Sequence, residues 1–155
     1  MICRKTLTIL VAVLAACSTE AFASPKVNQP ATKAIAKDEK QIPIEFITAD
    51  QLKTKIAANE PIIIVDLRAP SSFQQSDKKI KGAIYTKLRR VAHRLRSEPR
   101  DKEVVVYCAC PADESAVLGA EELQRAGFKR VRALKGGWQA WLQAGGQVDA
   151  KARTP

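Results

Sequence analysis

Apolar residues in the central part of the chain fall into short runs separated by segments of mixed polarity. The runs at 61–66 and 103–108 are rich in β-branched residues and predict buried strands, and 130–134 predicts a further strand. Between them, apolar residues recur three or four positions apart, as in amphipathic helices. This alternation predicts an α/β fold with a largely parallel sheet.

The first ordered element is expected at 43–47, a short strand-like run. Thr48 and Gln51 after it have the spacing of a capping box, which opens a helix with Leu52 and Ile56 on its buried face. Two more helices are expected later in the chain. One covers 115–126, with a buried stripe of Ala116, Ala120 and Leu123, and Gly127 ends it. The other carries Trp138, Trp141 and Leu142.

The segment between the first two buried strands is more polar. Residues 69–79 predict a short helix and a loop, and 81–85 predict a second, shorter strand. Residues 87–96 predict a basic amphipathic helix, because their apolar side chains have helical spacing and Lys or Arg occupies most other positions. The apolar positions are Leu88, Val91 and Leu95.

Residues 1–23 have the pattern of an export signal, with a positive start and an uncharged, mostly apolar stretch at 6–16. That stretch is shorter than the roughly 20 residues that span a bilayer. Two cleavage sites compete. Leu14 to Cys17 resembles a bacterial lipobox, which predicts lipidation at Cys17 and a membrane tether, whereas Ala21–Ala23 suits ordinary cleavage after Ala23. Both alternatives place the mature protein outside the cytosol, in the periplasm or cell envelope.

Residues 24–42 are polar and lack apolar periodicity, so we expect a flexible tether there and a disordered tail at 150–155. One domain is then expected at 43–149. The formal charge of +10 favours anionic partners. Because export argues against nucleic acid, the expected partners are small anions, an acidic partner or an anionic membrane surface.

Cys108 and Cys110 are the thiols left after the signal is removed. Cys108 ends a strand directly before a helix, and ligands of open α/β sheets bind beyond the carboxyl ends of strands. Backbone N–H groups of the loop and the helix N-terminus favour negative charge there. We therefore predict that the pKa of Cys108 lies below the free-cysteine value of roughly 8.5.

Five motifs, in order and in register, resemble the rhodanese domain over about Ile44 to Val148. They are Asp66–Arg68, Ile80–Ile84, Tyr107–Cys108 with Ser115–Ala116, Ala126–Phe128, and Leu134–Trp138. The resemblance implies a rhodanese-like three-layer α/β domain, in which a central, mainly parallel sheet is flanked by helices. It also implies a sulfurtransferase that carries sulfur as a persulfide on Cys108, with thiosulfate and cyanide as the usual test donor and acceptor.

The same resemblance implies an active-site loop formed by Ala109, Cys110, Pro111, Ala112, Asp113, Glu114 and Ser115. Asp66, Arg68, Gly136 and Gly137 are implied as supporting residues, with no cofactor and no metal. The alternative is a non-catalytic rhodanese-like module that docks a partner protein or senses anions through this loop.

Three departures from the family pattern stand out. Lys79 replaces a frequent histidine, and His93, the single histidine, is expected to be an ordinary surface residue. The loop is one residue longer than usual, as in related phosphatases, but Glu114 stands where phosphatase chemistry requires arginine. Cys110 is an extra thiol, with three possible roles: a resolving cysteine served by a thiol reductase or acceptor protein, half of a soft-metal site, or a packing residue.

Overall fold

The structure is a computed structural model that describes residues 43–151. The predicted export signal, both cleavage sites, the lipidation site Cys17 and the predicted tether lie outside the described residues. Among the helices of residues 43–151, none has the length and apolar character needed to cross a membrane.

Five parallel strands form the central sheet, in the order β1-β6-β5-β2-β4. Their bounds are Glu45–Ile47 for β1, Arg130–Leu134 for β6, Glu103–Tyr107 for β5, Ile62–Asp66 for β2 and Ile84–Tyr85 for β4. The central strand β5 is buried along its whole length, which explains its continuous apolar sequence. The predicted α/β fold with a mainly parallel sheet is confirmed.

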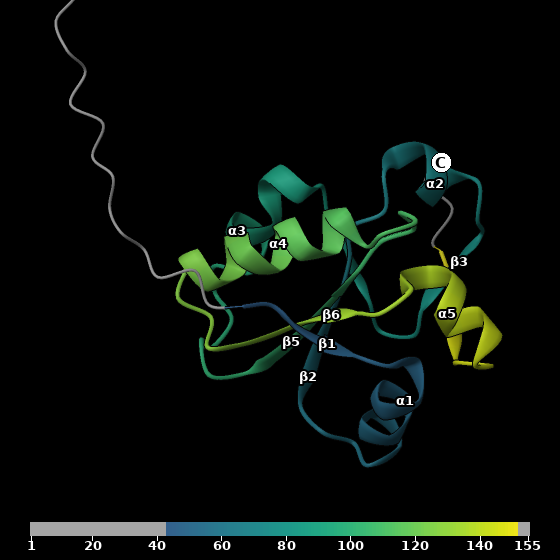
Figure 1. The fold of residues 1–155 in the computed structure, drawn as a ribbon, viewed down its shortest axis with the longest axis horizontal. Helices are drawn as coiled ribbons and strands as arrows, with labels where there is room; N and C mark the ends of the chain where they lie inside the picture. Colours follow the sequence, from purple (N-terminus) through teal and green to yellow (C-terminus); the bar gives the residue numbers. More distant parts are fainter. Residues whose placement is uncertain (1–42, 152–155) are drawn as a thin grey trace, which may run out of the picture. The chain divides into compact units, whose positions relative to one another are not determined.

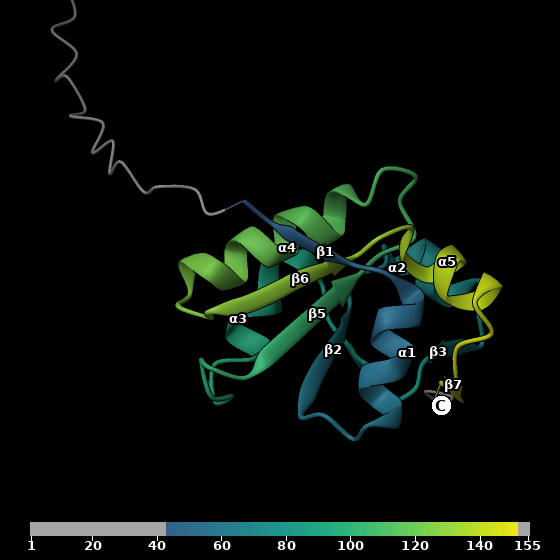
Figure 2. The same cartoon turned by 60° about the horizontal axis from the view of Figure 1, so that its bottom comes forward.

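Helices cover both faces of this sheet (Figures 1 and 2). On one face, α3 (Val91–Arg94) and α4 (Glu114–Arg125) pack against β2, β5 and β6. On the other face, α1 (Ala49–Ala57) and α5 (Gly137–Gln143) enclose a second core that includes Leu52 and Trp141. The short helix α2 (Pro70–Gln74) follows β2. The domain therefore has three layers and two apolar cores.

Local signals set the helix ends. The Thr48 side chain accepts a hydrogen bond from the Gln51 amide at 3.2 Å, and the Gln51 side chain accepts one from the Thr48 amide at 2.9 Å, so the predicted capping box is confirmed. Helix α4 is followed by Gly127 at φ 92°, a backbone conformation that favours glycine. The predicted stripe of α4 is buried as expected.

Two helix predictions need correction. The predicted basic helix at 87–96 is instead a 3₁₀ turn, η1 (Leu88–Arg90), followed by the single turn of α3. Its crowded positive charges repel one another at helical spacing, so packing of Val91 and Leu95, rather than helix propensity, holds the segment. In α5, the two tryptophans are buried as predicted, but Leu142 is 43% exposed because seven residues present only a narrow buried stripe.

A two-stranded antiparallel ribbon was not predicted. It pairs β3 (Lys78–Ile80) with β7 (Val148–Ala150), so ordered structure reaches the first residue of the predicted tail. The predicted strand at 81–85 shrinks to the two residues of β4, because Gly82, at φ 73°, makes a turn between β3 and β4. Three-residue polar strands carry no periodic signal, and their pairing depends on residues far apart in the chain.

Candidate active site

Parallel strands bring their carboxyl ends to one edge of the sheet. The residues that follow β2, β5 and β6 therefore meet there, and main-chain hydrogen bonds join them. The Leu67 amide donates to the Tyr107 carbonyl at 2.8 Å, and the Trp138 amide donates to the Cys108 carbonyl, also at 2.8 Å. These bonds position Cys108 independently of its own side chain.

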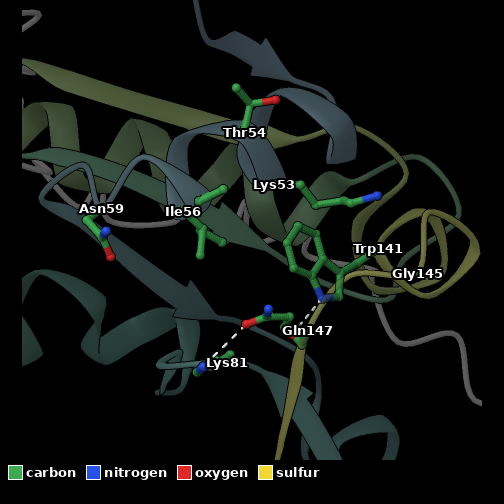
Figure 3. A pocket seen from close by; sticks show the side chains of 9 residues that line it. Lys53, Thr54, Ile56, Asn59, Lys81, Trp141, Gly145 and Gln147 are labelled. Carbon is green, nitrogen blue, oxygen red and sulfur yellow. Dashed lines mark hydrogen bonds between the residues drawn. The ribbon is translucent and has the colours of Figure 1, made fainter.

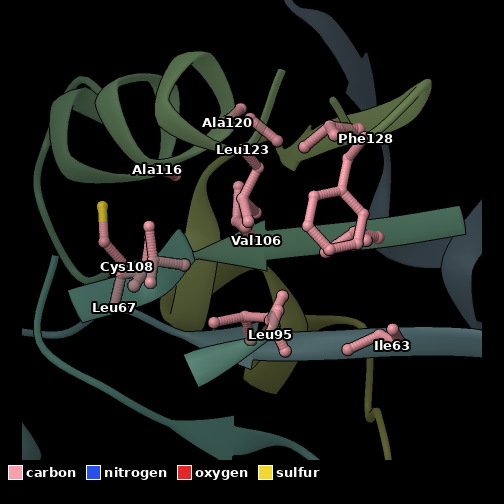
Figure 4. Packing of buried hydrophobic residues seen from close by; sticks show 14 residues of the cluster. Ile63, Leu67, Leu95, Val106, Cys108, Ala116, Ala120, Leu123 and Phe128 are labelled. Carbon is pink, nitrogen blue, oxygen red and sulfur yellow. The ribbon is translucent and has the colours of Figure 1, made fainter. Parts of the chain in front are cut away.

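The Cys108 sulfur lies at the boundary between this edge and the core. Figure 4 shows it pointing away from the packed side chains of the cluster and toward the first turns of α4. The Cys110 amide donates a hydrogen bond to the sulfur at 3.3 Å, and the Ala116 amide, which donates to the Asp113 carbonyl at 2.9 Å, lies close enough to favour the Cys108 thiolate as well. The N–H groups of Cys110 and Ala116 therefore both favour a negative charge on this sulfur, and we call this pair of amides the two-amide cradle.

Ionisation of Cys108 differs from the sequence-based prediction. Burial, followed by the influence of the Cys110 side chain, raises the pKa of its thiol to about 12, because together they outweigh the two backbone N–H groups that favour the thiolate. The residue is 0% exposed. The prediction of a lowered pKa was wrong because the sequence reveals the helix N-terminus but not how completely the thiol is covered.

Cys110 is the more acidic partner of this thiol pair. Burial opposes its ionisation, but hydrogen bonds from the Ser115 hydroxyl, the Cys108 side chain and the Ser115 amide together lower its pKa. Its sulfur lies 3.2 Å from Ser115 Oγ, and its side chain is half-buried. Of the two thiols, Cys110 is therefore the one that loses its proton more readily.

Asp113 anchors the far end of the loop. It adopts a left-handed conformation, with φ 57°, directly before α4. Its carboxylate does not cap α4 but accepts a hydrogen bond from the Gly136 amide at 2.7 Å, across 23 positions of sequence. Aspartate tolerates this backbone conformation better than most residues, a signal that could have marked the position. The carboxylate thus ties the cysteine loop to the turn before α5.

Gly137 is held directly under the loop. It has φ 48°, and a Cβ atom there would overlap the Cys108 carbonyl oxygen and lie 3.3 Å from Asp113 Oδ1. The absence of a side chain allows the Trp138 amide to reach Cys108. In the Leu134–Trp138 motif, the second glycine, Gly137, therefore allows the backbone before α5 to lie close to the Cys108 carbonyl.

Gly137→Ala should lower the free energy of unfolding by about 2–4 kcal/mol, because backbone strain adds to displacement of the Cys108 carbonyl. Gly145→Ala is the matched control, since Gly145 has φ 64° but open space around its Cβ position. It should cost only about 1 kcal/mol. Chemical denaturation of both variants measures the difference, and equal losses would contradict the close-contact argument.

Asp66 and Arg68 form a buried ion pair behind the loop. The Arg68 guanidinium donates to Asp66 Oδ2 at 2.7 Å and to the Lys78 carbonyl at 3.0 Å. The Tyr107 hydroxyl donates to the same carboxylate oxygen at 2.7 Å and accepts from the Ile80 amide at 3.2 Å. This network joins the ends of β2 and β5 to the β3–β7 ribbon.

Aromatic rings surround the guanidinium of Arg68. Its central carbon lies 4.4 Å from the centre of the Trp138 ring and 5.1 Å from that of Phe73. Within residues 43–151, its Nη1 atom has no hydrogen-bond partner. Cation–π contact offsets that missing bond, so the arginine serves as a packing element under the site.

Residues 48–144 match the family model of the rhodanese-like domain, which covers more than half of the chain. This chain belongs to the rhodanese-like domain family. It is 29% identical to a sulfurtransferase of Allochromatium vinosum over 66% of this chain and 92% of that protein. It is 26% identical to the thiosulfate sulfurtransferase GlpE of Coxiella burnetii over 56% of this chain and 78% of that protein.

Solved structures agree with this family. The rhodanese-like domain of an Anabaena sp. protein superposes with a TM-score of 0.60 at 30% identity, covering 73% of this chain and 86% of that one. The domain is therefore related in sequence to proteins named sulfurtransferases, and in fold to another rhodanese-like domain.

The active-site loop of this rhodanese-like domain, residues 109–115, contains no arginine. Pro111, Ala112 and Glu114 are exposed, and the Asp113 carboxylate is turned to Gly136. A phosphate dianion would find the two backbone donors but no bidentate cation. His93 is exposed on α3 and contacts Arg96, as expected of a surface residue.

Other features of the described domain lie away from the thiols. A cavity of about 720 Å³ between α1 and α5 is lined by nine residues, including Lys53, Lys81 and Trp141, and none belongs to the cysteine loop (Figure 3). Over residues 43–151, no group of three or more His, Cys, Asp or Glu side chains is arranged to hold a metal ion.

Proposed function

We propose that this protein is a sulfurtransferase that moves sulfane sulfur from a small anionic donor of the thiosulfate type to a thiophilic acceptor, through a persulfide on Cys108. The observation that carries the proposal is the Cys108 sulfur at the start of α4, with the amides of Cys110 and Ala116 directed at it. The named sulfurtransferases among its relatives support the same reaction class.

In the proposed reaction, the proton of Cys108 passes to the hydrogen-bonded sulfur of Cys110. The Cys108 sulfur then attacks the outer sulfur of thiosulfate, a new S–S bond forms, and sulfite leaves with the electron pair of the broken bond. The two amides stabilise the anionic persulfide. A thiophilic acceptor removes the outer sulfur and returns Cys108 to the thiolate.

Access to Cys108 requires movement of the loop, because the side chain is completely covered. Ala109 to Ala112 are the residues that must move, and they carry small or exposed side chains. The main-chain anchors at both ends would stay in place while this middle segment opens.

The test is incubation of the reduced protein with thiosulfate and measurement of sulfite. One equivalent of sulfite per chain is expected without any acceptor, and repeated turnover is expected with cyanide in the presence of a dithiol reductant. Protein that releases no sulfite would overturn the proposal.

Complete burial of Cys108 favours one rival, a rhodanese-like module that docks a partner without turnover. Absence of sulfite together with a folded domain would support that rival. Glu114 argues against phosphatase chemistry in either case.

We also propose that the protein works outside the cytosol, tethered to a membrane through Cys17. The apolar stretch before Cys17 supports this placement. The mature N-terminus, determined by mass spectrometry, tests it: a chain that begins at Ser24 and fractionates as soluble would establish ordinary cleavage.

A further inference from the structure

We infer that Cys110 resolves the Cys108 persulfide, so that the protein also releases sulfide and closes a Cys108–Cys110 disulfide. This inference rests on the proposed function. It adds a second activity, reductive release of the bound sulfur, for which the protein's own thiols supply the electrons.

Proximity of the two thiols is the first argument. The loop curls back so that the Cys110 amide reaches the Cys108 sulfur at 3.3 Å, with only Ala109 between the cysteines. The two thiols also shift each other's ionisation, because the Cys110 side chain raises the pKa of Cys108 and the Cys108 side chain lowers the pKa of Cys110. A disulfide needs Cα atoms roughly 4.4 to 6.8 Å apart, which a curled loop provides and an extended one does not.

The contrast between the two thiols is the second argument. Cys108 is fully covered, whereas Cys110 is half-buried and its sulfur lies 3.2 Å from Ser115 Oγ, to which the thiol donates a hydrogen bond. The Ser115 donors also lower the pKa of Cys110, which makes it the thiolate of the pair. The attacking group is therefore held ready beside the sulfur that it must attack.

The chemistry balances without an external oxidant. Cys110 gives the proton that it received from Cys108 to the outer sulfur of the persulfide, and its thiolate attacks the Cys108 sulfur. The bond between the Cys108 sulfur and the outer sulfur breaks, and the outer sulfur leaves as hydrosulfide with that proton and the bonding electrons. With thiosulfate, two thiols and one donor thereby give one disulfide, one sulfite and one hydrogen sulfide. The two cysteines are oxidised and the sulfane sulfur is reduced.

A new cycle then requires a dithiol reductant that opens the disulfide by thiol exchange. The partner expected at this loop is consequently a protein or small molecule with two neighbouring thiols. Exposed Pro111 and Ala112 leave the outer side of the loop free for such a partner.

The test uses the full chain with Cys3→Ser and Cys17→Ser, so that Cys108 and Cys110 are its only thiols. Reduced protein is freed of reductant and mixed with thiosulfate under anaerobic conditions. Sulfite, sulfide and intact protein mass are measured. One equivalent each of sulfite and sulfide is expected, with a protein mass lower by two hydrogens.

Cys110→Ser in the same background should still release one equivalent of sulfite, gain one sulfur atom on Cys108 and release sulfide only at background level. A matched control, Cys110→Ser with Ala112→Cys, restores a second thiol at an exposed loop position. It should also retain the persulfide, because the thiol no longer lies against Cys108.

The outcomes separate the two claims. Sulfite release with a stable persulfide in the two-thiol protein would overturn the resolving role and leave the sulfurtransferase proposal standing. Equal sulfide release by the Ala112→Cys control would overturn the positional argument. Failure to release sulfite at all would overturn the sulfurtransferase proposal itself.

Discussion

Cys108→Ala should abolish sulfite release from thiosulfate, a loss of about a thousandfold or more, because the other thiol of residues 43–151, Cys110, lies against Ser115 rather than within the two-amide cradle. The fold should survive. Alanine removes only one buried atom from the core cluster, so the free energy of unfolding should fall by about 1 kcal/mol. Thiosulfate assays and chemical denaturation on the same preparation measure both effects.

His93→Ala is the matched control for that experiment. The imidazole is exposed and contacts Arg96, so its loss should leave both activity and stability unchanged. Sulfite release that persists in Cys108→Ala would instead identify Cys110, the more accessible thiol, as the sulfur acceptor, and our assignment would be wrong.

Arg68→Ala should lower the free energy of unfolding by about 3–5 kcal/mol, since it leaves the Asp66 carboxylate buried without its cation. Both side chains of the pair are 0% exposed, so solvent screens the remaining Asp66 charge only weakly. Activity should fall as well, because the rings of Trp138 and Tyr107 pack around the guanidinium beside the loop. Chemical denaturation gives the stability change.

Arg125→Ala removes the same side chain from an exposed pair with Glu121 and Glu122, and should cost about 0–1 kcal/mol. Adding Asp66→Asn to Arg68→Ala should recover part of the stability, because the isolated buried charge is then gone. Comparable losses in Arg68→Ala and Arg125→Ala would contradict the buried-pair interpretation.

The order and type of the main helices and strands could be predicted from the sequence. The run at 103–108 is apolar throughout because β5 is covered on both faces, and the Thr48–Gln51 spacing marks a cap that actually forms. Such signals are local, so they survive in a single sequence. The position of Cys108 at a strand–helix junction followed from the same signals.

Features that depend on tertiary contacts could not be predicted from the sequence. The pKa of Cys108 depends on how many atoms cover the sulfur, and the hydrogen bond from Gly136 to Asp113 joins segments without any shared local pattern. The β3–β7 ribbon likewise depends on a pairing between short polar segments far apart in the chain. The helical spacing of apolar residues among basic ones suggested a regular helix at 87–96, where packing instead selects a 3₁₀ turn followed by the single turn of α3.

The two tryptophans of the chain both lie on α5, the helix that begins under the cysteine loop. Trp138 donates its amide to the Cys108 carbonyl, and its indole lies against the Arg68 guanidinium. The protein therefore carries its own optical probe. Indole emission depends on neighbouring charge and solvent, so fluorescence during a stopped-flow mixing experiment would follow opening of the loop and loading of sulfur in real time, without any attached dye.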